Sequence, residues 1–219
     1  MRTERRKLLR RFGLPLAYEQ LKYIENPSVA YILIPNLPIK DSMIVETDFL
    51  LNTFLGDCTI FQMFVGIDAN KTEVNVSSLQ IGWTGSRFST KLGKTGIKIK
   101  TPVPKYGVDW KFVFSKLDNK NQNVLLNGNQ ISVESYYYGD STLIGDYDNK
   151  ETFKLLLFTS YNFIKPFRTR IYNFICSADG KRIVQLIPCK RKSDGVVGMY
   201  DLVGRKFYTS PNGVAFTGG

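Results

Sequence analysis

The stretch that decides the fold is RIYNFICSADGKRIVQLIPCKRKSDGVVGMYDLVGRKFYTSPNGVAFTGG, residues 170–219. Short apolar and β-branched runs alternate in it with turn-forming residues, a pattern typical of strands joined by tight turns. We expect two strands joined at Ala178, Asp179 and Gly180, and a second pair joined at residues 203–205. Bulky side chains fall on both faces of residues 199–203. This segment is therefore expected to be an inner strand that closes a sandwich together with an edge hairpin.

Strand patterns continue upstream of this stretch. Residues 43–49 alternate apolar side chains with Glu46 and Asp48, residues 110–114 put Trp110 on an apolar face, and residues 152–161 are apolar on both faces, as in a central strand. Asn127 and Gly128 lie between two extended runs, which is a strong hairpin signal. Many short strands with frequent turns predict an all-β sandwich, and residues 14–219 are expected to form it as a single domain.

The positive charge is concentrated at the start of the chain. The formal net charge is +11, and residues 1–13 hold six basic residues against Glu4. These basic residues are Arg2, Arg5, Arg6, Lys7, Arg10 and Arg11. One interpretation is a solvated helical start; the other is a docking arm for an acidic partner, with Leu8, Leu9 and Phe12 as a short apolar stripe. Nucleic acid is not expected as a partner, because no known nucleic-acid-binding module is recognisable.

Targeting signals and disulfides are not expected. Arginines and a proline interrupt the apolar run of residues 7–16, so no secretory signal is predicted, and no stretch reaches the apolar length of a membrane span. The three cysteines are Cys58, Cys176 and Cys189. Cys176 and Cys189 flank a predicted hairpin and could face each other, but the odd count favours reduced, buried thiols in a protein assembled in the cytoplasm.

The absence of histidine argues against several enzyme classes. The commonest general base and zinc ligand are missing, and a Ser-His-Asp or Cys-His arrangement is impossible. Glycoside hydrolysis needs only two carboxylates, and Glu46 and Asp48 are the nearest candidates. We interpret them as solvent-facing acids on an edge-exposed strand, so the protein is expected not to be an enzyme.

Metal and cofactor sites are likewise not predicted. Asp140, Asp146 and Asp148 could contribute oxygen ligands to a calcium site, but their spacing does not match an EF-hand loop. We interpret them as turn residues and expect no metal and no cofactor.

Glycan binding is the alternative kind of site, because sugars are held by aromatic platforms beside amide and carboxylate groups. Tyr136, Tyr137 and Tyr138 follow one another next to Asp140, and at least one of these tyrosines should be exposed. Trp83 is a second candidate platform. Ordinary strand aromatics and a core tryptophan remain the competing interpretations of these residues.

Residues at both ends of the body resemble a known family. Residues 170–174, 184–189, 197–202, 206–208 and 213–219 are similar to the KIYxFxI, LVxxxIPC and VGLYDLVNxKFYxN-type motifs of a LamG-like, concanavalin A-like family found in bacteriophages, prophages and gut bacteria. The opening motif of that family is echoed by LPLAYEQLKYIENPSVAYI at residues 14–32. Ala17 stands where the family pattern has glycine.

The resemblance implies a concanavalin A-like jelly roll and a structural part of a phage. It implies a fibre, appendage or decoration subunit of the virion, and some structural relatives bind glycans. The motif positions are expected to be core, so no functional residue is carried over. We therefore expect a non-enzymatic virion protein that partners other capsid or tail proteins, oligomerises, is exposed on the particle and binds host-surface glycans. The alternatives are a stand-alone carbohydrate-binding module and a glycoside hydrolase.

Overall fold

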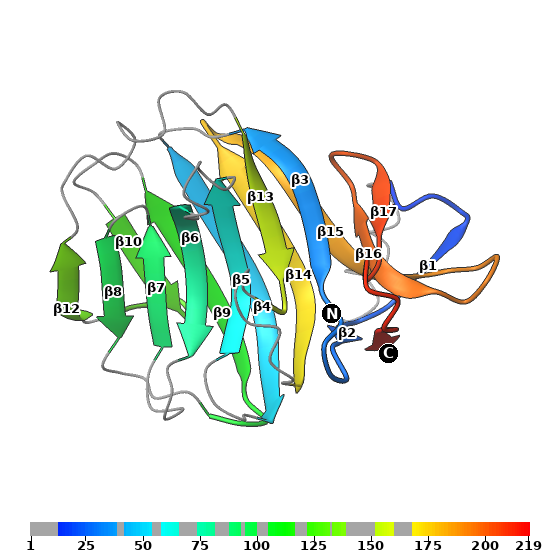
Figure 1. Cartoon of the computed structure of the whole chain (residues 1–219), viewed down its shortest axis with the longest axis horizontal. Helices are drawn as coiled ribbons and strands as arrows, with labels where there is room; N and C mark the ends of the chain where they lie inside the picture. The colour runs from blue at the N-terminus through cyan, green and yellow to red at the C-terminus, as the bar shows by residue number, and fades with distance from the viewer. Residues whose placement is uncertain are drawn as a thin grey trace.

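The computed structural model describes residues 13–38, 42–53, 58–65, 74–81, 88–92, 95–99, 105–116, 122–131, 133–138, 152–159 and 168–219. These residues contain strands and turns and no helix. Their strands form two antiparallel sheets that pack face to face as a jelly-roll-like β-sandwich (Figure 1). The all-β fold class expected from the sequence is confirmed.

The larger sheet has eleven strands in the described residues. Its main path is β11 (Asn129–Gln130), β10 (Gln122–Leu126), β9 (Asp109–Lys116), β4 (Met43–Thr53), β14 (Arg168–Ala178), β15 (Lys181–Arg191), β16 (Val197–Asp201) and β17 (Lys206–Tyr208). Three short strands, β1 (Tyr18–Gln20), β2 (Ile24–Glu25) and β18 (Thr217–Gly218), pair off this path.

The smaller sheet has seven strands in the same part of the chain. Their order is β12 (Val133–Tyr138), β8 (Thr95–Ile99), β7 (Phe88–Leu92), β6 (Val74–Ile81), β5 (Cys58–Val65), β13 (Thr152–Leu157) and β3 (Ile32–Pro38). The strand expected to be central, β13, lies between β5 and β3, and its residues 153 and 155–157 are buried while Lys154 is exposed. This sheet lies in front in Figure 1, and β15, β16, β17 and β1 extend beyond its edge strand β3.

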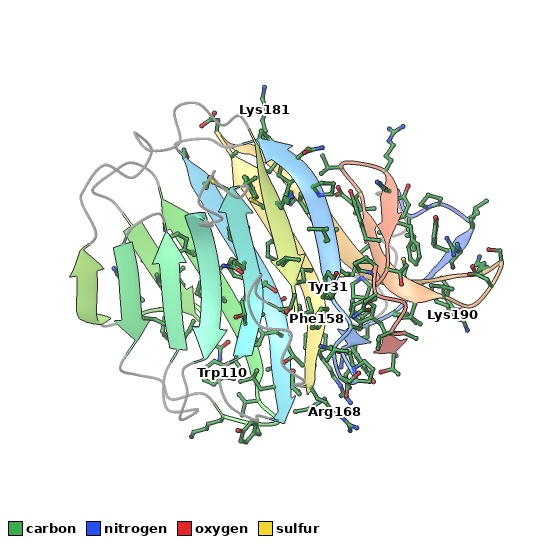
Figure 2. The ribbon with its side chains drawn as sticks, in the orientation of Figure 1. Tyr31, Trp110, Phe158, Arg168, Lys181 and Lys190 are labelled. Atoms are coloured by element: carbon green, nitrogen blue, oxygen red, sulfur yellow. The ribbon has the colours of Figure 1, made fainter. Side chains whose placement is uncertain are left out.

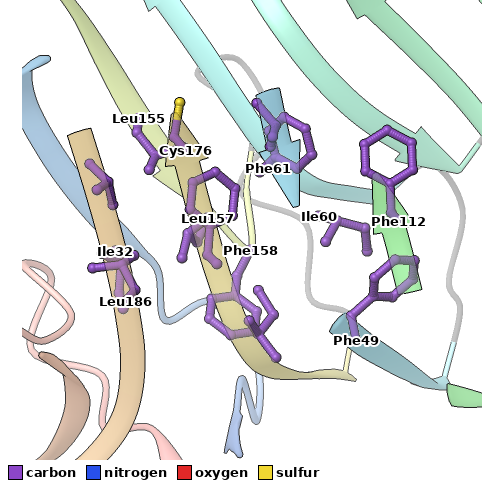
Figure 3. Packing of buried hydrophobic residues seen from close by; sticks show 14 of the residues in the cluster. Ile32, Phe49, Ile60, Phe61, Phe112, Leu155, Leu157, Phe158, Cys176 and Leu186 are labelled. Carbon is purple, nitrogen blue, oxygen red and sulfur yellow. The ribbon is translucent and has the colours of Figure 1, made fainter. Parts of the chain in front are cut away.

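Alternating burial explains why the two sheets stack. In β4, Met43, Val45, Thr47 and Phe49 are buried while the residues between them are half-buried. The ring of Phe61 on β5 meets that of Phe112 on the larger sheet, with centroids 6.0 Å apart (Figure 3). It also meets the ring of Phe174 on the larger sheet, with centroids 5.4 Å apart. Each such fully buried phenylalanine contributes about 1.5–3 kcal/mol of apolar burial. The alternation predicted for residues 43–49 and 110–114 is thus confirmed.

The two ends of the described chain fill a fork between β14 and β15. The two strands pair with each other near their shared turn, at residues 174–178 and 181–186. Farther from that turn they diverge, so that β2 pairs with the start of β14 and β1 with the end of β15. Strand β18 then pairs with the free side of β2. Residues far apart in sequence therefore complete one sheet.

Three sharp turns contain residues with positive φ, and in two of them these residues are of types that favour it. Asn127 and Gly128 have φ of 52° and 82°, and Asp179 and Gly180 have φ of 48° and 72°. A pair of positive φ values is the signature of the two-residue hairpin turn whose twist matches antiparallel strands. Arg205, in the turn before β17, also has a positive φ of 53°. All three turns lie where the sequence predicted them.

The strands of the terminal stretch close the sandwich, as predicted. Met199 belongs to the main core, whereas Tyr200 packs on the opposite face of β16 with Ile187 and Cys189. Tyr18 covers this second cluster, with its ring 5.0 Å from that of Tyr200. Strand β16 is therefore an inner strand with side chains packed on both faces, and β17 is the edge strand of the hairpin.

Cys176 and Cys189 are free, buried and do not face each other. Cys176 lies opposite Val184 and Cys189 lies opposite Gly198, in two different clusters. Burial raises the pKa of each thiol to about 12. Because these two cysteines lie in different clusters and are both free, the expectation of buried thiols without a disulfide between them is confirmed for this pair.

Several sequence-based predictions lie outside the described residues. They include the basic arm of residues 1–12, Trp83, Asp140, Asp146 and Asp148. The boundary between the arm and the sandwich therefore stays a prediction. Within the described ranges, no helix is long and apolar enough to cross a membrane.

Candidate functional site

The tyrosine platform predicted from the sequence is described only in its backbone. Tyr136, Tyr137 and Tyr138 lie on β12, at the end of the smaller sheet's strand order, and pair with residues 95–97 of β8. Their side chains, like Trp83 and Asp140, are outside the described part of the structure. Among the side chains that are described, no group of three or more His, Cys, Asp or Glu residues is placed to hold a metal ion.

The two acids considered for catalysis lie on the outward face of β4. This strand is central in the larger sheet, between β9 and β14, so the expectation of an edge-exposed strand is wrong. Glu46 lies opposite the apolar residues Val113 and Ile175. Asp48 instead accepts a hydrogen bond from Nδ2 of Asn173, at 2.7 Å. The two carboxyl groups are half-buried in different surroundings.

A β-bulge in β14 brings two consecutive side chains to the outward face. Ile171 pairs with Phe49 and Asn173 pairs with Asp48, which leaves Tyr172 as the extra residue. Tyr172 and Asn173 are both half-buried, between the buried Ile171 and Phe174. Bulges re-aim side chains in this way and are frequent beside functional sites.

The bulge is held by bonds from the neighbouring strand. The hydroxyl of Thr47, on the core side of β4, donates to the carbonyl oxygen of Asn173 at 2.9 Å. On the outward side, the backbone N–H of Asp48 donates to Oδ1 of Asn173 at 3.2 Å. Asn173, the residue that follows the extra one, is thus bonded to both faces of β4.

Tyr172 reaches across β4 to the next strand. Its hydroxyl donates to Oδ1 of Asp109, on β9, at 2.7 Å. Burial and this hydrogen bond both raise the pKa of Tyr172 above its ordinary value. The phenol therefore stays protonated at neutral pH and stays a donor to the carboxylate.

Residues of β2 and the segment before it complete the cluster. The ring of Tyr23 meets that of Tyr172 edge to face, with centroids 6.1 Å apart. The guanidinium of Arg170 lies 4.3 Å from the centroid of Tyr23 and donates through Nε to Oε2 of Glu25 at 2.7 Å. The ammonium of Lys22 lies 5.8 Å from the centroid of Tyr172. We call Lys22, Tyr23, Asp109, Arg170 and Tyr172 the Tyr172 patch.

This patch combines aromatic surface with charged hydrogen-bonding groups. Lys22 and Asp109 are exposed, and Tyr23, Arg170 and Tyr172 are half-buried, so their polar ends are oriented while remaining accessible. Aromatic rings offer a flat apolar surface, and fixed charged groups beside them provide orientation and specificity. Such an arrangement suits a ligand with both C–H faces and hydroxyl groups, as a sugar has.

The sequence analysis missed this patch because it assigned the motif to the core. That expectation is wrong for Arg170 and Tyr172, which lie in the motif of residues 170–174 yet point outward. One signal was available: Tyr172 and Asn173 stand together between two apolar residues, which breaks strict alternation. Lys22 and Tyr23, by contrast, had no local signal linking them to β14.

The comparisons with known proteins bear on the fold. No family model matches the chain, and no curated protein matches it either. A solved Trypanosoma rangeli sialidase is 10% identical over 64% of this chain and 21% of its own, with a TM-score of 0.44. An alginate lyase of Pseudomonas aeruginosa is 8% identical over 79% of this chain and 90% of its own, with a TM-score of 0.46. A family 7 alginate lyase is 12% identical, covering 65% and 62% of the two chains, with a TM-score of 0.43.

These comparisons correct one prediction. The expectation that the protein is not an enzyme is wrong as it stands, because the solved structures that resemble this chain in fold are enzymes. At these identities the likeness concerns the fold, and it assigns neither an activity nor a catalytic residue to this chain. The chain spans about a fifth of the length of the sialidase.

Proposed function

We propose that this protein is a fibre, appendage or decoration subunit of a bacteriophage particle, and that its sandwich binds host-surface glycans. The observation that carries the binding part is the Tyr172 patch. Two tyrosine rings, a carboxylate and two cations converge there on the outward face of the larger sheet. Thr47 and Asp48 bond to Asn173 at the bulge, and the contacts of the cluster around Tyr172 are separate from those bonds.

The particle setting is supported by the family resemblance of the two ends of the body. The point at which the basic arm joins the body also suits attachment. The ammonium of Lys192 donates to the carbonyl oxygen of Leu16 at 2.7 Å, and its backbone N–H donates to that of Ala17 at 2.9 Å. Leu16 is 91% exposed, and Lys192, which contacts its carbonyl oxygen, is exposed as well. A fixed, basic junction with an exposed leucine favours docking on an acidic surface.

A glycan array tests the binding part. The full chain should bind glycans on the array, and Tyr172→Ala should lose binding because the aromatic surface is removed. Tyr172→Phe should keep the ring and lose only the bond to Asp109, so it should retain weaker binding. Tyr137→Ala tests the competing platform on β12, and circular dichroism checks that each variant is folded. A blank array, or binding lost in Tyr137→Ala but not in Tyr172→Ala, would overturn the assignment to this patch.

Deletion of residues 1–12 tests the particle part. Particles assembled with the shortened chain should lack the protein, because its attachment is removed, while the purified chain should keep its glycan binding and its thermal unfolding transition. Undiminished incorporation of the shortened chain would contradict docking by the arm. If the full and the shortened chain both bind glycans and neither is incorporated into particles, the stand-alone carbohydrate-binding module would be favoured instead.

A further inference from the structure

We propose that the ligand of the Tyr172 patch is a carboxylated glycan, an inference that rests on the proposed function. The reason is that, of the charged side chains considered on this face, the exposed ones are two cations, Lys22 and Arg168, and one acid, Asp109. It goes beyond glycan binding in general because it names the chemical class of the sugar.

The acids around Tyr172 already have partners. Asp109 accepts from the hydroxyl of Tyr172 at 2.7 Å. Glu25 accepts from Arg170 at 2.7 Å, and its side chain is only 15% exposed. Asp48 accepts from Asn173 at 2.7 Å. A carboxylate keeps further lone pairs after accepting one bond, but Glu25 and Asp48 are half-buried, so Asp109 is the exposed acid of the three.

The cations retain donors. The contact with Glu25 uses Nε of Arg170, and a guanidinium has further N–H groups on its two terminal nitrogens. Lys22 is exposed and lies near the ring of Tyr172, where its ammonium has three donors. Arg168 is exposed on β14, two residues before Arg170, with the buried Thr169 between them. Arg168 and Arg170 therefore project from the same, outward side of the strand.

A sugar carboxylate would accept charge-assisted hydrogen bonds from these cations through a charged group, whereas a neutral sugar would accept them only through its hydroxyl groups. A ring face stacked on Tyr172 brings a substituent of that sugar toward Lys22 and the terminal nitrogens of Arg170. Charge-assisted hydrogen bonds from an ammonium or guanidinium to a carboxylate are about twice as strong as neutral ones. The raised pKa of Tyr172 keeps its hydroxyl uncharged, so within the patch Asp109 carries the negative charge and Lys22 and Arg170 carry the positive charges.

The test compares carboxylated polymers with their own neutral forms. The full chain is titrated with polygalacturonate, hyaluronan and gellan, and with the carboxyl-reduced form of each, in which the carboxylate has become a hydroxymethyl group. We expect at least one carboxylated polymer to bind about tenfold or more tightly than its reduced form. That preference should shrink as salt rises from about 0.05 to 0.5 M, because salt screens exposed charges.

A matched pair of charge reversals separates local from general attraction, since the whole chain carries a net charge of +11. Lys22→Glu should weaken binding of the carboxylated polymer about tenfold or more. Lys181→Glu makes the same change in net charge at an exposed residue, and Figure 2 shows Lys181 at the opposite end of the sandwich from Arg168. It should change binding less than about twofold.

The outcomes distinguish this inference from the proposed function. Equal binding of carboxylated and reduced polymers that is lost in Tyr172→Ala would overturn the carboxylate preference and leave glycan binding standing. Equal losses in Lys22→Glu and Lys181→Glu would overturn it too, because the attraction would then be general. Failure to bind any of the three carboxylated polymers, with neutral glycans bound on the array, would also overturn it. No binding to any glycan would refute both proposals.

Discussion

Asp48 and Asn173 hold each other across β4 and β14 by two hydrogen bonds that run in opposite directions. The backbone N–H of Asp48 donates to the side chain of Asn173, and the side-chain amide of Asn173 donates to the carboxylate of Asp48. The pair lies at the bulge and replaces the regular ladder where Tyr172 is inserted. The orientation of the Tyr172 patch therefore depends on a contact between residues 125 positions apart in sequence.

The Asp48→Ala substitution should destabilise the sandwich. It removes the acceptor of the Asn173 amide on a half-buried face, and an unpaired polar group of this kind costs about 1–3 kcal/mol. Urea unfolding followed by tryptophan fluorescence measures the loss. Glu46→Ala is the matched control, since it removes an acid from the same face of the same strand, two residues away. Equal unfolding midpoints for the two variants would argue against a stabilising role of the hydrogen bonds between Asp48 and Asn173.

Gly198→Ala should destabilise the closing hairpin. A Cβ at this position would meet the backbone oxygen of Tyr208 and, at 2.8 Å, the ring of Phe207. Because strand pairing fixes both neighbours, we expect a loss of about 1–3 kcal/mol or more from overpacking. Thermal unfolding measures the effect. Ser193→Ala, in the exposed turn before β16, should leave the midpoint within about 1 °C; a similar midpoint for G198A would contradict this packing.

Phe216→Ala should show how strongly the last residues close the sandwich. Phe216 is 4% exposed, and its ring centroid lies 5.3 Å from that of Phe158. Removing a buried phenylalanine side chain typically costs about 3–5 kcal/mol. Denaturant unfolding should detect this loss, while Thr217→Ala, at the exposed next residue, should be nearly neutral. Deletion of residues 196–219 should be more severe still, and an unchanged thermal transition after that deletion would refute the closing role.

Alkaline pH should lower stability through the two buried thiols. Burial raises the pKa of Cys176 and Cys189 from 9.0 to about 12, so above pH 9 the unfolded chain loses protons that the folded chain keeps. The contribution is fully present below pH 9 and is lost as pH rises toward 12. The free energy of unfolding should fall by about 1.4 kcal/mol per pH unit for each thiol once it is fully ionised in the unfolded state.

Urea unfolding at pH 8, 9 and 10 checks this dependence. A double variant, Cys176→Ala with Cys189→Ala, should be less stable overall but should show a flatter decline between pH 9 and 10. Tyrosines contribute mainly at higher pH, because their ordinary pKa is about 10. An identical slope for the double variant and the unchanged chain would show that the thiols do not ionise differently on folding.

The strands and turns could be predicted because their signals are local. The alternation along residues 43–49 places Phe49 in the core whatever strand pairs with β4, and Asn127 and Gly128 are residue types that favour the positive φ they adopt. The closing role of the terminal stretch could be predicted for the same reason. Met199 and Tyr200 carry bulk on opposite faces, and a strand with two apolar faces has to be covered on both.

The candidate site could not be predicted, since its residues come from three separate segments. Lys22 and Tyr23 precede β2, Asp109 begins β9, and Arg170 and Tyr172 lie on β14. Their meeting depends on the pairing of β2 with β14, on the position of β4 between β9 and β14, and on the bulge. Glu46 and Asp48, two neighbours that sequence reasoning did single out, turned out to have different partners.

The residue pattern alone was enough to establish an all-β sandwich, its turns and the closing role of its last strands, because side-chain alternation and turn conformation depend on a few neighbouring residues. Strand order and register were decided by long-range packing. This packing places β4 inside its sheet instead of at an edge. It also places both ends of the described chain between β14 and β15. Such pairings depend on total burial and hydrogen bonding over the whole fold, and no short segment encodes them.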